Sequence, residues 1–212
     1  MKVLMISDRE VKGGAAVAAS RLASGLLERG HEVHRLVYHA ETDSPPWNRV
    51  VMPEESTFTR LNIAIRNRSG GGLQERLNDL VQRTKMRQLL EEVRPDIVNV
   101  HNLAEAVGRT EWSLAMIEQC LRDCPVVWTL HDQWSFTGRC AYAFDCEKFM
   151  VGCDHECPTP NEHPALAPDR IAPAWARKRA LLESSDRIAA VTPSRWLADE
   201  ARRGMWAARR VE

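Results

Sequence analysis

The sequence predicts an α/β protein built on a doubly wound parallel sheet. Short apolar runs rich in β-branched residues alternate along the chain with longer segments of helical spacing. Repeated strand–helix units with right-handed crossovers produce a parallel sheet covered on both faces. The chain of 212 residues, 44% of them hydrophobic, is long enough for one well-buried core. We therefore predict a single Rossmann-like domain over residues 1–212, with a Cys-rich loop at 138–169.

The first half of the chain contains three predicted strands and three predicted helices. In order they are strand Lys2–Ile6, helix Ala15–Arg29, strand His31–Tyr38, helix Leu73–Val93, strand Asp96–Val100 and helix Trp112–Arg122. Gly30 stands where a left-handed cap ends the first helix. Residues 41–56 show no clear period, and Gly70-Gly71-Gly72 predicts a flexible break.

The second half continues the alternation after a long irregular segment. Its elements are strand Pro125–Leu130, the Cys- and Pro-rich loop 131–169, helix Pro173–Glu183, strand Arg187–Val191 and a helix that ends at Arg203. Ser194 precedes this last helix and is its expected N-cap, because a serine side chain accepts a hydrogen bond from an amide of the first turn.

Composition and charge narrow the classes of function. The 29 basic and 29 acidic residues balance, which argues against a dedicated nucleic-acid-binding protein. No apolar run is long enough for a signal-peptide core or a membrane span. We therefore expect a cytoplasmic protein, at most bound to the inner face of the membrane, whose six cysteines are mostly reduced.

Two predicted strands end in a histidine followed by a polar residue. His101-Asn102 follows strand 96–100, and His131-Asp132 follows strand 125–130. Ligands of open α/β sheets bind beyond the carboxyl ends of the strands, and a neutral imidazole there accepts a proton or binds a hydroxyl. A lone strand-end histidine is more often a structural hydrogen-bonding residue. The His-Asp pair of metal-dependent phosphohydrolases lies on helices, so we reject that class.

A glycine-bearing turn leads from the first strand into the first helix. Gly13, Gly14 and Ala15 would let a ligand phosphate approach the backbone at the helix N-terminus. The turn matches neither the dinucleotide-binding fingerprint nor the Walker motif. A simple turn before an amphipathic helix explains these residues equally well.

Four cysteines fall close together in the long loop. Cys140, Cys146, Cys153 and Cys157 are separated by five, six and three residues. Four thiolates suit a tetrahedral structural zinc site, and His155 could replace one of them. The alternatives are two disulfides or unlinked buried thiols. We favour zinc because a polar loop otherwise has little to order it.

Residues 57–90 combine basic and apolar side chains. Seven of them are arginine or lysine, and apolar residues interleave with the first of these. Such a segment can lie on an anionic membrane surface, although it also contains Glu75 and Asp79, and we favour a solvated helical face. Trp134 is either a packing residue or a platform for a sugar ring.

The chain resembles the N-terminal half of a glycosyltransferase family 4 enzyme, the retaining GT-B type of group 1. The similarity is closest to the subgroup of colanic-acid and exopolysaccharide biosynthesis. The motifs that carry it are Gly13–Ala16, Leu26–Val33, Pro95–Asn102, Val127–Gly138 with the following cysteines, and Val191–Leu197.

The resemblance implies a role for each candidate. His131 would act near the reacting sugar with Asp132 orienting it, and Gly13, Gly14 and Ala15 would approach the donor phosphates. Four residues would line the cleft for the acceptor: His101, Asn102, Trp134 and Arg195. The donor would be a nucleotide-sugar, the acceptor a glycan or lipid-linked sugar, and transfer would need no metal.

Two departures from the family pattern bear on these expectations. Cys153 and Cys157 stand one residue further apart than in the family's C-x-x-C pair, and the chain ends at Glu212, where the family continues into its donor-binding domain. We therefore expect the isolated chain to be inactive until that domain is supplied in cis or in trans. The alternative is a non-catalytic binding module with a structural four-cysteine loop. A generic nucleotide-binding Rossmann protein is disfavoured because the dinucleotide fingerprint is missing.

Overall fold

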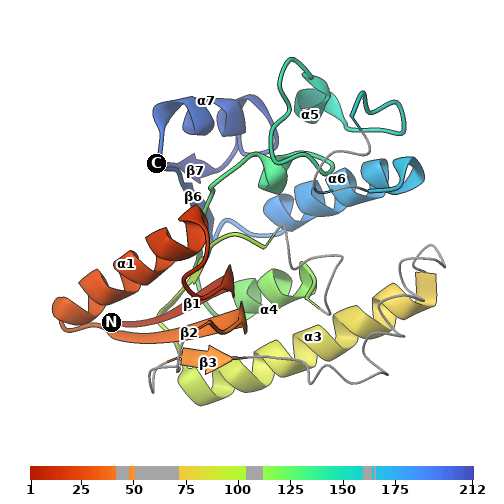
Figure 1. Cartoon of the computed structure of the whole chain (residues 1–212). Coiled ribbons are helices and arrows are strands. Elements are labelled where there is room, and N and C mark those ends of the chain that lie inside the picture. Colours follow the sequence, from red (N-terminus) through yellow and green to blue (C-terminus); the bar gives the residue numbers. More distant parts are fainter. Residues whose placement is uncertain (42–47, 51–71, 104–111, 160–163, 165) are drawn as a thin grey trace. The chain divides into compact units, whose positions relative to one another are not determined.

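The computed structural model describes residues 1–41, 48–50, 72–103, 112–159, 164 and 166–212. Gly70 and Gly71 of the predicted break, and residues 57–71 of the basic segment, lie outside these residues, whereas Gly72 begins a helix. The chain folds into two compact units, residues 1–126 and 127–212, and both consist of strands with flanking helices (Figure 1). The predicted Rossmann-like α/β class is confirmed.

The first unit is built on four strands, in the order β3-β2-β1-β4. They are β1 (Lys2–Arg9), β2 (Glu32–His39), β3 (Asn48–Val50) and β4 (Ile97–Val100). All three pairings are parallel. Val3 pairs with both Val33 and Ile97, so β1 lies in the interior of this sheet, as its buried apolar sequence predicts.

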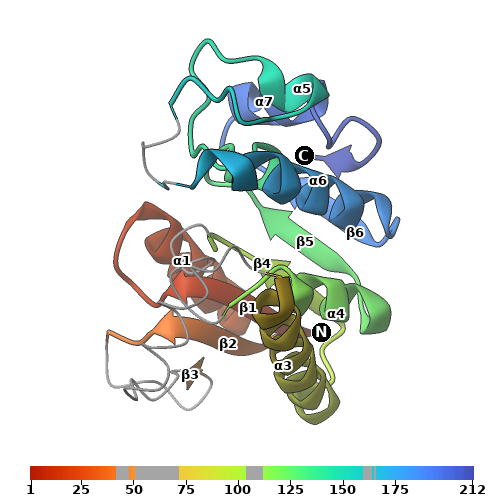
Figure 2. The ribbon, with the colours of Figure 1, turned by 90° about the vertical axis from the view of Figure 1, so that its right-hand side faces the viewer.

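Three helices cover the two faces of this sheet. They are α1 (Gly14–Glu28), α3 (Gly72–Val93) and α4 (Ala115–Asp123). Helix α1 lies on one face, and α3 and α4 lie together on the other (Figures 1 and 2). Small residues of α1, Ala19 and Ala23, pack against Val3, Met5 and Val33, and their size brings the helix close to the strands.

The second unit carries three strands, in the order β5-β6-β7. They are β5 (Val126–Thr129), β6 (Ile188–Val191) and β7 (Arg210–Val211). Its helices are the 3-10 turn η1 (Trp134–Phe136), α5 (Lys148–Val151), α6 (Pro168–Glu183) and α7 (Arg195–Arg203). Trp206 is completely buried, lies edge-on to Trp128 at 6.2 Å between ring centroids, and donates its indole N–H to Ser135.

Five elements differ from the sequence prediction. Helix α6 begins at Pro168, five residues before Pro173, because a proline in the first turn loses no helical hydrogen bond. Helix α5 and turn η1 interrupt the loop predicted to be irregular, and the short strands β3 and β7 lie where the sequence predicts no strand. The Ser194 cap is confirmed, since its hydroxyl accepts a hydrogen bond of 3.2 Å from the Leu197 amide.

Candidate functional site

The glycine-bearing turn is exposed, and Glu41, which lies outside the turn in the sequence, binds two of its amides. Gly13 has a φ of 91°, which a residue with a side chain rarely adopts, and no side chain caps the first turn of α1. Glu41 Oε2 accepts the amides of Val11 (3.0 Å) and Lys12 (2.7 Å), and its other oxygen binds Arg9. These bonds hold the turn open beside the helix N-terminus, and nothing lies where a Cβ on Gly13 would point.

The end of β4 places His101 in the interior of the first unit. His101 is 1% exposed, its amide donates to Ile6 O at 2.8 Å, and its Nε2 lies 2.7 Å from Asn99 Oδ1. Asn102 follows at the strand end, where its carbonyl accepts the Asp8 amide at 3.1 Å. This geometry favours the structural role for His101 and leaves Asn102 as the better candidate for a ligand contact.

The end of β5 delivers His131 and Asp132 to the candidate catalytic position in the second unit. Leu130, the residue before them, donates its amide to Val191 O at 2.8 Å, which fixes the strand end to β6. Burial lowers the pKa of the His131 imidazole below its ordinary value of 6.5, so the ring is mostly neutral at pH 7. Asp132 Oδ1 accepts the Trp134 amide at 2.8 Å, which closes a turn directly after the strand.

Trp134 and Arg195 occupy different environments from each other. Arg195 is the first residue of α7 and is exposed, as a residue that contacts a ligand should be. Trp134, which we expected in the acceptor cleft, is 8% exposed, and the Lys178 ammonium lies 3.9 Å from its ring centroid. The structure therefore corrects that expectation, because the ring packs in the interior and one of its faces is taken by the lysine.

Gln133 and Lys178, which the sequence analysis does not identify, hold the segment after β5 in place. Gln133 is buried, accepts the Ala143 amide and donates to Glu200 of α7 at 3.2 Å. Lys178 of α6 is buried as well and bonds three main-chain carbonyls of the same segment. An inward stripe on α6 could have revealed the lysine, because Ile171, Lys178 and Leu182 recur at helical spacing.

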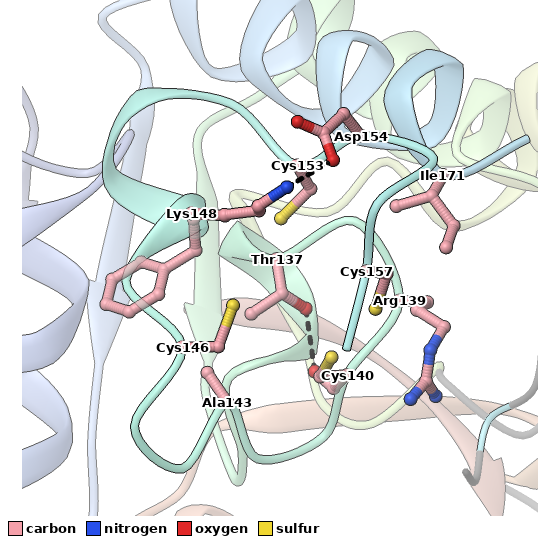
Figure 3. Close-up of a pocket in the computed structure, with 11 residues that line it drawn as sticks. Thr137, Arg139, Cys140, Ala143, Cys146, Lys148, Cys153, Asp154, Cys157 and Ile171 are labelled. Atoms are coloured by element: carbon pink, nitrogen blue, oxygen red, sulfur yellow. Dashed lines mark hydrogen bonds and ion pairs between the residues drawn. The ribbon is translucent and has the colours of Figure 1, made fainter. Parts of the chain in front are cut away.

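The four clustered cysteines line one small cavity together with Thr137, Lys148 and Ile171 (Figure 3). None of them is in a disulfide. Burial raises the pKa of the Cys140 thiol, and it raises that of Cys153 to about 11, so both remain protonated at neutral pH. Within the part of the chain that the structure describes, no three His, Cys, Asp or Glu residues are arranged to hold a metal ion. The predicted zinc site is therefore not supported.

This loop is ordered by hydrogen bonds and packing, so it does not need a metal ion to hold it. Arg139 is buried and donates to Pro164 O at 2.9 Å and to the Thr159 hydroxyl at 3.1 Å. The Gly138 amide donates to Cys153 Sγ at 3.1 Å. A Cβ on Gly138 would lie 2.6 Å from an Ile171 methyl, so the absence of a side chain lets α6 approach the loop.

The described part of the basic segment is α3, which presents apolar residues to solvent. Leu77, Leu80 and Val81 are 48%, 62% and 46% exposed, whereas Met86 and Leu90 further along the helix are buried. None of the helices in the described ranges is both long and apolar enough to cross a membrane.

Comparisons with known proteins agree on one family and one fold. The family model described as Glycosyltransferase Family 4 matches residues 12–212. WcaC of Escherichia coli (strain K12), named for colanic acid biosynthesis glycosyl transfer, is 28% identical over 213 residues, which cover 94% of this chain and 50% of that protein. Sucrose-phosphate synthase from Thermosynechococcus elongatus is similar in structure, with a TM-score of 0.56 and 12% identity over all of this chain and 47% of its own. The chain thus spans about half the length of the relatives it matches.

Proposed function

Since the chain belongs to glycosyltransferase family 4, we propose that it is the acceptor-side half of a retaining GT-B enzyme. In this proposal the enzyme moves a sugar from a nucleotide-sugar donor to a hydroxyl of a glycan or lipid-linked acceptor. In the same proposal, the donor is bound by a second half that corresponds to the part of the relatives that this chain does not match. Similarity to WcaC favours an acceptor of the exopolysaccharide class.

The observation that carries this proposal is the position and protonation of His131. It stands at the carboxyl end of β5, where ligands of open α/β sheets bind, and its pKa is lowered by burial. A neutral imidazole there can accept a hydrogen bond from a sugar hydroxyl or take up its proton. Asp132 fixes the turn that presents the ring.

The glycine turn supports the donor side of the same proposal. The uncapped first turn of α1 presents main-chain amides, and the exposed Gly13 and Gly14 leave room beside them. Phosphate groups bind such helix N-termini because the amides and the helix dipole both favour negative charge. We assign Gly13, Gly14 and Ala15 to the diphosphate of the donor, and Asn102 and Arg195 to the walls of the cleft.

Transfer is tested by supplying the donor-binding half. The chain is joined to the half of WcaC that it does not match, and both the fusion and the 212-residue chain are incubated with nucleotide-sugars and oligosaccharide acceptors. We expect the fusion to release nucleoside diphosphate and form product, and the 212-residue chain to do neither. The anomeric proton coupling of the product should show retention of configuration. If the fusion folds, binds nucleotide-sugar and still transfers nothing, the chain is better described as a binding module.

We further propose that α3 rests on an anionic membrane surface. Leu77 and Leu80 are exposed on α3, which also carries the basic residues Arg76 and Lys85. Each basic residue near such a surface contributes about 1 kcal/mol, and the acidic Glu75 and Asp79 of the same helix offset part of this attraction. Replacing both leucines with glutamine should reduce binding to vesicles containing anionic lipid by about tenfold or more, because each leucine that enters the interface contributes roughly 1.5 kcal/mol or more.

Flotation of the protein with such vesicles measures this effect. The control is Leu22→Gln on α1, a leucine of similar exposure (42%) on another helix, which should leave flotation unchanged. Equal flotation of the wild type and the double variant would show that α3 is an ordinary solvated helix.

A further inference from the structure

One buried cation in the second unit has no part in the function described so far. Lys178 of α6 is 2% exposed, and its ammonium donates to the carbonyls of Trp134 (2.8 Å), Thr137 (2.9 Å) and Gly138 (3.3 Å). It also lies over the Trp134 ring, 3.9 Å from the centroid. All three protons of the ammonium thus have an acceptor in the segment that follows the candidate catalytic pair.

Simple packing does not account for a lysine at this position. A methionine or leucine would fill similar space without the desolvation of a charge. The carbonyls of residues 134, 137 and 138 belong to a 3-10 turn and the irregular chain after it, where a buried carbonyl needs a donor from elsewhere. Lys178 supplies that donor to three of them from a single side chain.

The bonds of Trp134 connect this lysine to the end of β5. The amide of Trp134 donates to Asp132 Oδ1, and its carbonyl accepts from Lys178. The Asp132 carboxylate also attracts the ammonium, as do Cys153 and Cys140 to the extent that they ionise. Any movement of Lys178 therefore acts on Trp134 and through it on the turn that carries His131 and Asp132.

We propose that Lys178 is a positioning residue for the turn that follows β5, and that its three carbonyl bonds and its stacking on Trp134 hold His131 and Asp132 in the orientation the transfer reaction needs. The geometric part of this proposal concerns the 212-residue chain alone. Its catalytic part rests on the proposed transferase function.

Local hydrogen exchange in Lys178→Met tests the geometric part. Methionine fills similar space without the donors, so we expect the protection of the Trp134 amide to fall by about tenfold or more relative to the Leu130 amide, which is bonded to β6. A merely structural lysine would lower both protections equally. The His131 ring titration, followed by NMR, should also shift upward as the loosened turn lets the ring gain solvent, because burial is what lowers its pKa.

The matched control is Arg179→Met, which removes the neighbouring cation from the same helix. Arg179 is exposed and paired with Glu183 at 2.7 Å, so its loss should leave the Trp134 amide and the His131 titration unchanged. A folded Lys178→Met protein with unchanged Trp134 protection and unchanged His131 titration would overturn the proposal.

Two further measurements decide the matter if Lys178→Met does not fold. Lys178→Gln keeps one N–H donor group and should show a smaller loss of the same kind. If that variant is unfolded too, the wild type is compared between about pH 6 and pH 8, across the pKa of Lys178, which burial lowers to about 7. The pH is raised until NMR shows that Lys178 loses its proton. Trp134 protection, normalised to Leu130, should fall in step with that loss, and a ratio that stays constant while Lys178 deprotonates would contradict the positioning role.

The catalytic part has a separate readout in the fusion with the donor-binding half. Lys178→Met should lower kcat while leaving the KM for the nucleotide-sugar nearly unchanged, because the donor is held elsewhere. Altered exchange with an unaffected kcat would retain the geometry and reject its catalytic importance. Failure of the transferase assignment would leave the exchange result standing.

Discussion

Replacing His131 with alanine should reduce kcat of the fusion enzyme by about 10²–10⁴-fold, the range for loss of a positioned acid–base group. The imidazole is at the end of β5 and mostly neutral at pH 7, because burial lowers its pKa. Activity in the wild type should therefore fall as the pH drops below 6.5 and the ring becomes charged. Steady-state kinetics across this range measure both effects, and His131→Gln should abolish the acid limb.

The matched control for this prediction is His155→Ala. His155 is an exposed histidine of the Cys-rich loop in the same unit, and its replacement should leave kcat and its pH dependence unchanged. Far-UV circular dichroism and the thermal midpoint establish that the His131 variants are folded. A folded His131→Ala enzyme with wild-type turnover would remove His131 from the catalytic assignment.

The sequence predicts the order of strands and helices well because buried parallel strands are nearly continuous apolar runs. Val98 and Val100 of β4 are completely buried, and their β-branched pattern needs no tertiary information to identify. Strand β7 has two residues and α5 has four, which is too short for any period to appear. The sequence places the start of α6 too late, because Pro173 is typical of a helix start although Pro168 already occupies the first turn.

The sequence predicts only those residues of the candidate site that directly follow a buried strand. His131 and Asp132 follow a buried run, so their place at the carboxyl end of a strand can be read from the sequence. The buried position of the Trp134 ring cannot be read from the sequence, because its partner Lys178 lies 44 positions away. The order of the Cys-rich loop likewise depends on distant bonds, such as those of Arg139 to residues 159 and 164.

The free energy of unfolding of the 212-residue chain should rise between pH 7 and about pH 9 because of Lys178. Burial lowers the pKa of this lysine from 10.5 to about 7 in the folded protein. Between these values the unfolded chain binds the extra proton, and stability therefore increases with pH. The slope can reach about 1.4 kcal/mol per pH unit, or up to about 2.7 kcal/mol over the two units.

Above pH 9 the buried thiols act in the opposite direction. The pKa of Cys153 is raised from 9.0 to about 11, so the unfolded chain loses this proton first and stability falls. Urea unfolding at intervals between pH 7 and 9 measures the change, and the difference between wild type and Lys178→Met isolates the lysine from the thiols. Lys178→Met should remove the rise, while Arg179→Met should retain it. A wild-type stability that is flat over this interval would mean that the three carbonyls and the Trp134 ring hold the ammonium charged despite its burial. The charge at the candidate site would then be permanent, and its positioning bonds would persist throughout the working pH range.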